Sequence, residues 1–513
     1  MPAWVDASLA ASPIVVILVA MLGLGWSAAR AGAAGLAVAL AVAWWGFGYG
    51  TRTLPDLGPV MASGGALLEA MFIAATILWI IFPALCIHEL QSRTGALEVL
   101  RRAMGRLSPD PRIGALLVAW FFVLFVEGAA GFGTSVALAA PFLVAAGFGR
   151  VEAVTIALVG HAVGVSFGAV GTPILPQMAV TPFTGRELAS ATAAYHALAG
   201  WVMPLLAMLL VTRALPSARG GPAIWGWTLL AAAAFLVPFY AIARFVGPEL
   251  PTLAGSLVGG AVFVAALTLV RRLRGTHDEE AAEAQPSGGL LRAGAPYLAL
   301  IGLVLITRLL PGVRDALSEA TVAWGLSGVF SGAFAPLYHP GTMLMAGFLA
   351  GAALQRAATG EVTGAAWRAL RQLAPVTLAL VAMLAISRVM VYAGMIDALA
   401  VAAAAAAGGA WPLFAPFVGV LGTFVTGSAT ASNILFTDFQ FATAERLGRP
   451  ALPLLGAQGF GAAVGNIVCP HNIIAAGATV NLAGREGEVL RRTLPVALLY
   501  AAMGGVLAWW VFG

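Results

Sequence analysis

The stretch IGALLVAWFFVLFVEGAAGFGTSVALAAPFLVAAG, residues 113–147, is apolar over nearly its whole length but is too long to be one membrane helix. At 1.5 Å per residue a continuous helix would run about 50 Å, whereas the hydrocarbon core of a bilayer is about 30 Å thick. A glycine cluster, Gly128, Gly131 and Gly133, divides the stretch near its middle. We therefore expect a re-entrant hairpin or a broken span, with its non-helical backbone buried in protein or lining a cavity.

The rest of the chain is similarly apolar. Of its 513 residues, 60% are hydrophobic and 10% are charged, whereas soluble proteins carry about 25% charged residues. Several apolar runs reach the roughly 20 residues that a spanning helix needs. The clearest runs are 12–28, 31–49, 67–87, 224–243, 252–270, 372–392 and 494–512. The composition predicts an all-α polytopic membrane protein with about twelve to fourteen membrane-embedded elements.

The basic residues indicate how the chain is oriented. The net charge of +5 comes from arginine alone, because the chain contains no lysine. Membrane proteins concentrate basic residues in cytoplasmic loops, which accounts for the high pI without a nucleic-acid partner. Arginines cluster in 93–112, after the third span, and again near Arg213, Arg271, Arg368 and Arg491. Placing these loops inside puts the N-terminus outside.

Ordered sequence matches indicate an internal repeat. Residues 94–100, TGALEVL, resemble residues 393–399, AGMIDAL. The spacing from Gly95 to the break at Gly128 equals the spacing from Gly394 to Gly427. A further match lies downstream, between AVGTPILP (169–176) and AVGNIVCP (463–470).

The two repeats are expected to have opposite orientations. Arginines from Arg101 to Arg112 follow the first match, whereas residues 400–411 after the second contain none. By the positive-inside rule the two loops lie on opposite sides, as in transporters built from inverted repeats. The expected units are N-terminal spans in 1–58, a first repeat in 59–180, connecting spans in 181–365 with a soluble linker over 271–295, a second repeat in 366–482 and a C-terminal span in 483–513.

The binding site is expected where the breaks meet. The second break lies at 426–433, inside the apolar stretch 412–445, and Pro173, Pro176 and Pro470 interrupt the helices that follow. Half-helix N-termini at membrane depth attract anions through unpaired N–H groups and the helix dipole. The alternative is that the glycines only allow close helix packing. The candidate substrate-binding residues are Gly128, Gly131, Gly133, Thr134, Ser135, Gly427, Ser428, Thr430, Ser432, Asn433, His471 and Asn472.

A few ionisable residues are candidates for ion coupling or anion contact. Glu127 adjoins the first break, where it is either a proton-binding carboxylate or a structural partner of backbone groups or an arginine. His161, with an ordinary pKa of about 6.5, and Glu69 are further candidates for the proton. Arg388 lies in an apolar run and is expected to contact either the substrate carboxylate or the membrane interface.

Other classes of protein find no support in the sequence. The six histidines are dispersed and form no HExxH motif. Cys86 and Cys469 each lie in an apolar run and fit neither a disulfide nor a metal site. There is no Walker motif, which argues against an ATP-driven pump, and no convergent nucleophile and base for an enzyme. We expect no cofactor and no metal.

The motif EGAAGFG (127–133) resembles the lactate permease family, which includes L-lactate, D-lactate and glycolate permeases. The resemblance runs from about residue 12 to the end and implies an inner-membrane permease that imports 2-hydroxymonocarboxylates with protons. The agreeing stretches are FGAVGTPI (167–174), FVGPELP (245–251), FVTGSATASN (424–433), CPHNIIAA (469–476) and GREGEVLRRT (484–493).

The chain departs from this family within the expected site. Loss of an acid together with a base leaves the net charge of the region unchanged, but it puts lactate itself in question as the substrate. The family usually has aspartate at Ala429, serine at Ala431 and lysine at Asn466, and it tends to have asparagine at His161 and Gln458 and glutamine at His471.

The sequence thus predicts a secondary active transporter in a bacterial inner membrane. Its expected partners are a small 2-hydroxymonocarboxylate of the lactate or glycolate type, a proton and the lipid bilayer, with no nucleic acid. A sodium-coupled or exchange carrier of another small organic anion is the alternative. A membrane-embedded enzyme and a channel are less favoured.

Overall fold

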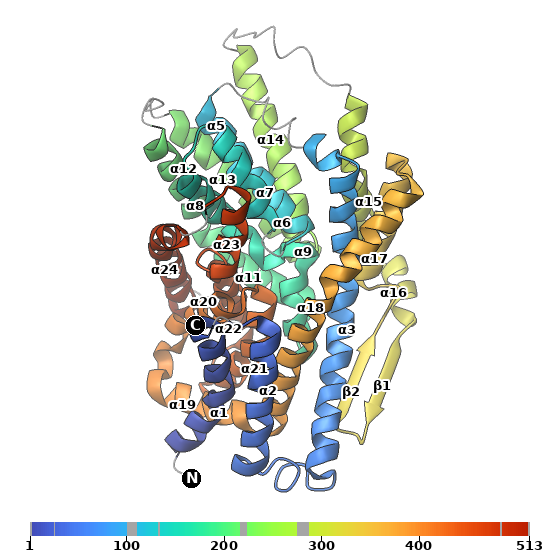
Figure 1. Cartoon of the computed structure of the whole chain (residues 1–513), viewed down its shortest axis with the longest axis vertical. Helices are drawn as coiled ribbons and strands as arrows, with labels where there is room; N and C mark the ends of the chain where they lie inside the picture. Colours follow the sequence, from blue (N-terminus) through green and yellow to red (C-terminus); the bar gives the residue numbers. More distant parts are fainter. Residues whose placement is uncertain are drawn as a thin grey trace.

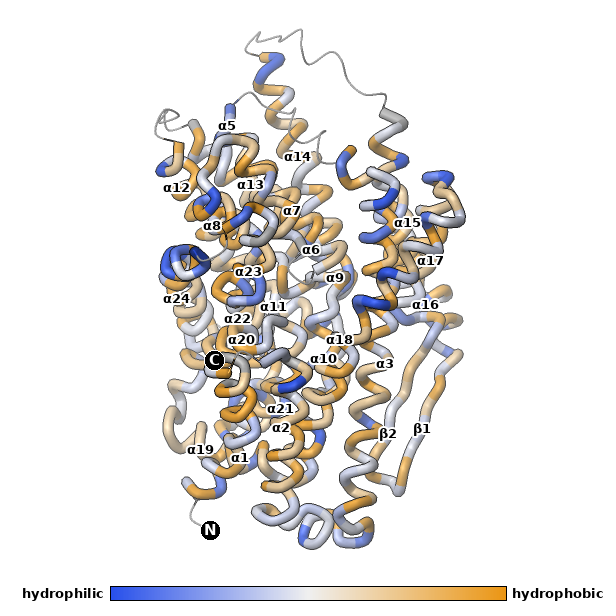
Figure 2. Tube along the Cα trace, viewed as in Figure 1, coloured by the Kyte–Doolittle hydropathy of each residue, from blue (hydrophilic) through white to orange (hydrophobic). Residues whose placement is uncertain are grey.

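The computed structural model describes residues 3–24, 26–99, 110–131, 134–215, 223–273, 287–482 and 485–510. Within these ranges, 11 helices are long and apolar enough to cross a membrane, or up to 12 if one pair bent by 44° counts as a single span. Two shorter apolar helices cover Trp4–Ile17 and Ser135–Ala145. The helical, multi-pass membrane architecture expected from the sequence is confirmed. Figure 2 shows hydrophobic residues along most of the length of the helices, with many of the hydrophilic residues near the two ends of the molecule.

Two long antiparallel helices lie side by side through the molecule (Figure 1). They are α3 (Gly58–Arg93) and α18 (Thr359–Tyr392). Near one end Glu89 Oε2 lies 3.4 Å from Arg368 Nε. Near the other, the Tyr392 hydroxyl donates to Glu69 Oε2 at 2.6 Å. These contacts pair the end of each helix with the start of the other, so the glycine turns that follow them, at Gly95 and Gly394, lie at opposite ends of the pair.

The first apolar stretch forms a hairpin. Its first arm is continuous through α5 (Pro111–Leu116), the π-helical segment η3 (Leu117–Phe122) and α6 (Val123–Ala129). The second arm is α7 (Thr134–Ala145). The rings of Phe122 and Phe142, one on each arm, lie 5.7 Å apart. The chain therefore turns back at the glycine cluster, as the sequence predicts.

The second apolar stretch forms a matching hairpin of α20 (Trp411–Thr426) and α21 (Ala429–Arg446). Its arms are joined along their length, because Trp411 Nε1 donates to Gln440 Oε1 at 3.0 Å and Ser432 Oγ donates to the Gly419 carbonyl at 2.9 Å. The break predicted within 426–433 falls at Gly427 and Ser428, between the two arms.

A broken span follows each hairpin. After the first, α8 (Arg150–His161) leads into the 3-10 segment η4 (Ala162–Phe167), the turn α9 (Gly168–Gly171), η5 (Thr172–Ile174) and α10 (Leu175–Val180). After the second, α22 (Ala451–Gly465) is separated from α23 (Pro470–Thr479) by a short interruption. The predicted proline interruptions are therefore present in both halves.

Small residues bring α22 against the second hairpin. A Cβ added at Gly461 would lie 1.9 Å from the Pro416 carbonyl oxygen, and one added at Gly419 would lie 2.5 Å from the Gln458 carbonyl oxygen. Backbones that approach this closely need residues without side chains at the contact, which is a common way for membrane helices to associate. This packing fixes the second break beside the interruption between α22 and α23.

The remaining helices surround these elements, and the linker is shorter than expected. Helix α14 continues to Leu273 and α15 begins at Ser287, so both enter the predicted linker 271–295, of which residues 274–286 lie outside the described chain. The surrounding elements are α1 (Ala3–Leu18), η1 (Val19–Gly23), α2 (Ala28–Ala41), η2 (Val42–Gly46), α11 (Gly185–Ala199), α12 (Val202–Ala214), α13 (Ala223–Phe245), α14 (Pro251–Leu273), α15 (Ser287–Leu309), α16 (Pro311–Glu319), α17 (Pro340–Gln355), α19 (Met395–Ala407), η8 (Gly408–Ala410) and α24 (Glu486–Trp510).

A small β-hairpin was not anticipated from the sequence. Strands β1 (Val322–Leu326) and β2 (Phe330–Phe334) pair antiparallel, with Val322 opposite Phe334. The hairpin lies outside the helical bundle against α3 (Figure 1), where the buried Phe330 ring packs over Gly65. It is remote from the breaks and does not shape the site.

Candidate functional site

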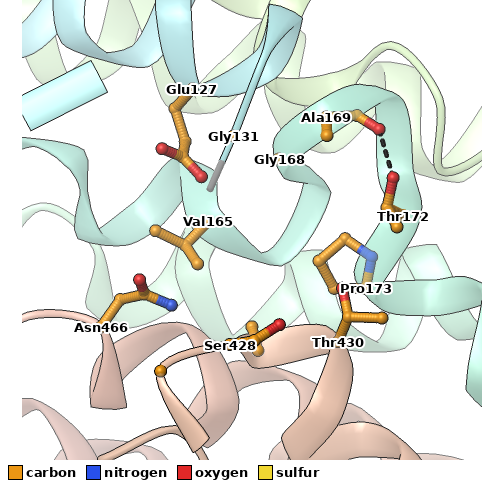
Figure 3. Close-up of a pocket in the computed structure, with 12 residues that line it drawn as sticks. Glu127, Gly131, Val165, Gly168, Ala169, Thr172, Pro173, Ser428, Thr430 and Asn466 are labelled. Atoms are coloured by element: carbon orange, nitrogen blue, oxygen red, sulfur yellow. Dashed lines mark hydrogen bonds between the residues drawn. The ribbon is translucent and has the colours of Figure 1, made fainter. Parts of the chain in front are cut away.

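A small buried cavity lies where the two hairpins meet (Figure 3). Its volume is about 40 Å³, well below the roughly 300–1,000 Å³ found for ligand sites. Its size therefore favours a small solute. Its lining residues come from both breaks and both broken spans, and they are Glu127, Gly131, Val165, Gly168, Ala169, Thr172, Pro173, Gly427, Ser428, Ala429, Thr430 and Asn466.

Glu127 is the one ionisable side chain among the described residues that line this cavity. It lies near the end of α6, is only 4% exposed, and its Oε2 accepts a hydrogen bond of 2.6 Å from Ser135 Oγ on α7. Gly168 allows the carboxylate to approach α9, because a Cβ there would lie 2.5 Å from Glu127 Oε1. Figure 3 shows Glu127 on the opposite side of the cavity from Asn466 and Ser428.

The start of α21 supplies hydrogen-bond donors to the opposite wall. Gly427 ends α20 with φ of 77°, a left-handed conformation that favours glycine, and Ser428 caps α21 by accepting from the Ala431 N–H at 3.3 Å. The first N–H groups of a helix have no carbonyl partner within the helix and carry the positive end of its dipole. The unpaired N–H groups and the helix dipole give this wall a positive potential.

The third wall is an unwound turn in the first broken span. Ala169 and Val170 both have positive φ, 43° and 56°, and Gly171 follows with φ of 80°. Such backbone is costly for a β-branched residue and is found where the surrounding structure requires it. Thr172 Oγ1 closes the turn by donating to the Ala169 carbonyl at 2.5 Å. The turn places backbone groups, and not long side chains, against the cavity.

Several predicted site residues line the cavity, and others support it from behind. Glu127, Gly131, Gly427, Ser428 and Thr430 line it. The supporting residues are buried and engaged elsewhere: Ser135 binds Glu127, Ser432 donates to Gly419, and Asn433 Nδ2 donates to the Pro173 carbonyl at 2.8 Å.

The structure gives different information on the three other predicted residues of the first break. Gly128 packs against α14, since a Cβ there would lie 2.5 Å from the Leu253 backbone nitrogen. Thr134 begins α7. Gly133 lies outside the described residues.

The predicted histidines and Asn472 do not line the cavity either. Asn472 is buried and donates to the side chain of Asn466, which does line it. His471 is exposed, although its Cβ lies close to Gly427. His161 is fully buried in α8, and its Nδ1 lies 2.7 Å from the Leu158 carbonyl oxygen.

Arg388 also lies away from the cavity. Its guanidinium pairs with Asp438, while Glu69 lies 3.9 Å away. Arg388 thus takes part in a buried ion pair, and its predicted contact with the substrate carboxylate or the membrane interface stays a prediction. Among the described residues, no group of three or more His, Cys, Asp or Glu side chains could hold a metal ion.

The site predictions omitted much of the cavity wall. The missed lining residues of the first half lie within the motif FGAVGTPI (167–174), except Val165, which precedes it. Asn466 and Ala429 were noticed as departures from a family pattern but not as lining. The missed residues are Val165, Gly168, Ala169, Thr172, Pro173, Ala429 and Asn466.

Two hairpins that turn back inside a multi-pass helical protein, with a small cavity between them, define a membrane transport protein. The fold agrees with that of MtrF from Neisseria gonorrhoeae, an antimetabolite efflux pump, with a TM-score of 0.50 and 16% identity over 89% of this chain and 85% of that chain. At this identity the likeness concerns the fold alone.

The chain belongs to the L-lactate permease family, whose model matches residues 6–332 and 323–512. A putative L-lactate permease of Haemophilus influenzae is 28% identical over 475 residues, covering 85% of this chain and 88% of the relative. The glycolate permease GlcA of Escherichia coli is also 28% identical, over 84% of this chain and 83% of the relative. The family expected from the sequence motifs is confirmed.

Proposed function

We propose that this protein imports a small 2-hydroxymonocarboxylate, of the lactate or glycolate type, together with a proton across a bacterial inner membrane. The names of its relatives, an L-lactate permease and a glycolate permease, support the substrate class. The small volume of the cavity and the helix N-terminus in its wall are consistent with a small anion.

The observation that carries the proposal is the isolated carboxylate of Glu127 in the cavity lining. An ionised Glu127 would repel a bound carboxylate, by about 4 kcal/mol for charges 4 Å apart at an effective dielectric constant of about 20. A proton on Glu127 removes this repulsion. Binding of the anion then favours binding of the proton and the reverse, because coupling between two sites is reciprocal. This linkage is the thermodynamic requirement for symport.

The alternating movement is proposed to use two inverted repeats, near 59–180 and 366–482. The antiparallel arrangement of α3 and α18 supports this, as do the hairpin and broken span that follow each of them. Both breaks contribute to one cavity. Repeats of opposite orientation allow one unit to rock or slide against the other around a central site.

A second candidate is a sodium-coupled or exchange carrier of another small organic anion. Ala429 and Asn466 favour it, because both line the cavity at positions where the family resemblance implies aspartate and lysine. Without this aspartate and this lysine, the cavity lining lacks one acid and one base that the family resemblance implies.

Purified protein in proteoliposomes distinguishes these functions. We expect radiolabelled lactate or glycolate to accumulate when a proton gradient, and not a sodium gradient, is imposed. Counterflow with a panel of unlabelled 2-hydroxy acids then ranks the substrates, and exchange itself separates a carrier from a channel. Accumulation driven only by sodium, or exchange without accumulation under either gradient, would contradict proton symport and support the second candidate.

A further inference from the structure

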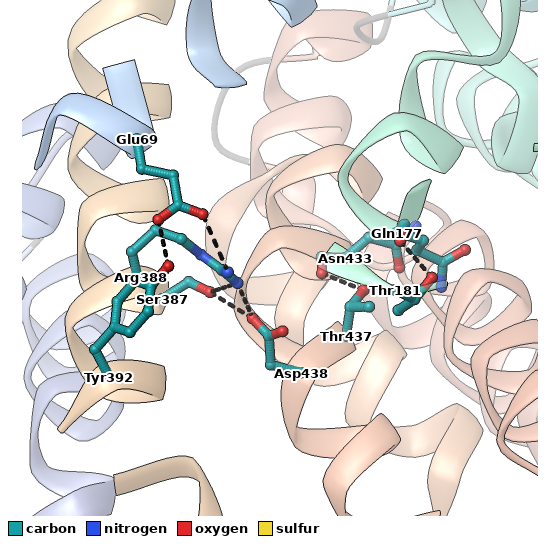
Figure 4. A network of polar contacts seen from close by, with 9 residues as sticks. All are labelled: Glu69, Gln177, Thr181, Ser387, Arg388, Tyr392, Asn433, Thr437 and Asp438. Atoms are coloured by element: carbon teal, nitrogen blue, oxygen red, sulfur yellow. Dashed lines mark hydrogen bonds and ion pairs between the residues drawn. The ribbon is translucent and has the colours of Figure 1, made fainter. Parts of the chain in front are cut away.

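A buried acid–arginine cluster lies apart from the cavity, between the α3–α18 pair and the second hairpin (Figure 4). We define it by Glu69 on α3, Ser387, Arg388 and Tyr392 on α18, and Asp438 on α21. Figure 4 shows the Arg388 guanidinium between the two carboxylates. The cluster therefore joins one arm of the second hairpin to the two long helices.

The two carboxylates are held differently. Asp438 Oδ2 accepts from Arg388 Nη2 and, at 2.9 Å, from the Ser387 hydroxyl. Glu69 Oε1 lies 3.9 Å from Arg388 Nη1, too far for a hydrogen bond. The other oxygen of Glu69 accepts from the Tyr392 hydroxyl at 2.6 Å. In this arrangement Arg388 donates hydrogen bonds to Asp438, whereas the hydrogen bond that Glu69 accepts comes from the neutral Tyr392 and its contact with Arg388 is longer.

The charges of the cluster do not balance when both acids are ionised. The ionisable groups facing Glu69 from the neighbouring elements are Arg388, Asp438, Tyr392 and Tyr49. The cluster therefore contains one cation, Arg388, and two carboxylates, Glu69 and Asp438. Glu69 is about nine-tenths buried, in a helix that spans the membrane. An unbalanced charge at such a place is strongly disfavoured. One proton restores neutrality.

The guanidinium also retains an unused donor. Arg388 is only 6% exposed, and among the described residues its Nε has no hydrogen-bond partner. A buried donor without an acceptor is unfavourable, and a carboxylate can take Nε and a terminal nitrogen together in a bidentate pair. The present pairing with Asp438 therefore leaves room for a second arrangement in which Arg388 binds a different carboxylate.

Helix α21 connects this cluster to the cavity. About one turn before Asp438, Asn433 donates to the carbonyl of Pro173, a residue of the cavity lining. A movement of α21 relative to α18 would thus displace Asp438 from Arg388 and shift the cavity wall at the same time.

We propose that Glu69 is a proton-binding site, separate from Glu127. Its carboxylate is neutralised by a proton in one arrangement and by pairing with Arg388 in the other. While Arg388 is paired with Asp438, Glu69 carries the proton. When α21 withdraws Asp438 into water, Arg388 pairs with Glu69, whose proton is released. Each arrangement is neutral apart from the solvated Asp438, and Glu69 binds and releases a proton as the two arrangements interchange. The release step rests on the proposed carrier function, whereas the protonation of Glu69 in the present arrangement does not.

The infrared absorption of carboxylic acids in the purified protein tests the protonation directly at neutral pH. Every protein compared carries Glu127→Gln, so that the other proposed proton-binding carboxylate cannot contribute. This reference protein should show a protonated-carboxyl band that is lost when Glu69→Gln is added. The same band should be lost in Asp438→Asn, although Glu69 is still present, because one acid then remains for one arginine. Two variants that reach the same result by different residues keep the test valid if one of them does not fold.

Glu89→Gln is the matched control on the same helix. Glu89 is also buried on α3, but it lies 3.4 Å from Arg368 and accepts from Gln372 at 2.8 Å. It is a one-to-one pair, so its replacement should leave the band unchanged. A band that survives in either Glu69→Gln or Asp438→Asn would overturn the proposal. Because the readout is not transport, this result is independent of whether lactate is carried.

Discussion

The two hairpins are alike in shape and opposite in chemistry. The first carries a carboxylate, Glu127, whose one hydrogen bond among the described residues comes from Ser135. The second is uncharged at its break, and its polar side chains bind one another and the backbone. Ser432 and Asn433 of this hairpin also accept hydrogen bonds from Gln458 on the neighbouring helix α22. One hairpin thus holds a group that can change its protonation, and the other provides a fixed frame of donors. We infer that proton and anion are bound by opposite walls of one cavity.

The largest expected effect comes from removing the acid of the first hairpin. Glu127→Gln keeps the size of the side chain but cannot release a proton. Accumulation of substrate under an imposed proton gradient should be abolished, while exchange of labelled for unlabelled substrate continues, because exchange does not require deprotonation. Continued accumulation by this variant would exclude Glu127 as the required proton carrier, and Glu69 and His161 would be tested next.

A smaller loss is expected when the acid is retained but displaced. In Gly168→Ala the new Cβ would lie 2.5 Å from Glu127 Oε1, so the carboxylate has to move. We expect kcat/KM for uptake to fall by about tenfold, corresponding to about 1.4 kcal/mol. Gly226→Ala is the control, because no atom lies within 4 Å of its added Cβ. Equal transport by the two variants would show that the position of the carboxylate is unimportant.

The smallest effects should distinguish a residue that lines the cavity, Ser428, from a residue that supports the second hairpin, Ser432. Ser428→Ala removes a hydroxyl from the cavity wall and should raise KM by about two- to tenfold, the equivalent of one ordinary hydrogen bond. It also removes the cap of α21 and should lower the free energy of unfolding by about 1 kcal/mol. Ser432→Ala, on the same helix, removes the hydrogen bond to Gly419. It should lower the free energy of unfolding by about 1–3 kcal/mol and leave KM nearly unchanged. Uptake kinetics and thermal unfolding in detergent measure both; the reverse pattern would exchange the roles of the two serines.

The breaks could be predicted from the sequence because membrane thickness limits helix length. The stretches 113–147 and 412–445 are too long for one span, and glycines or hydroxyl residues interrupt both. The walls contributed by Ala169 and Val170 could not be predicted, since their left-handed backbone is imposed by tertiary packing on residues that rarely adopt it.

The ion pairing of Arg388 could not be predicted from the sequence either. Arg388 is visible as a charge in an apolar run, but Glu69 and Asp438 are distant along the chain and come together only through the packing of α3, α18 and α21. The β-hairpin was not predicted for a different reason. Its strands are only five residues each, too short for a clear alternation of apolar and polar residues.

The hydrogen bonds between the two broken spans have a consequence for which acids can enter. Gln177 Nε2 donates to the Leu455 carbonyl at 3.0 Å, and Ser166 Oγ donates to the Gly459 carbonyl at 3.2 Å. With the bond from Asn433 to Pro173, they tie the first half to the second around the cavity. Because these hydrogen bonds hold the cavity walls together, the cavity resists widening. A longer or branched acid would fit only if buried hydrogen bonds were broken. If the proposed carboxylate binds in this cavity, discrimination by length follows from the stiffness of the walls and requires no contact made specifically with the shorter acid.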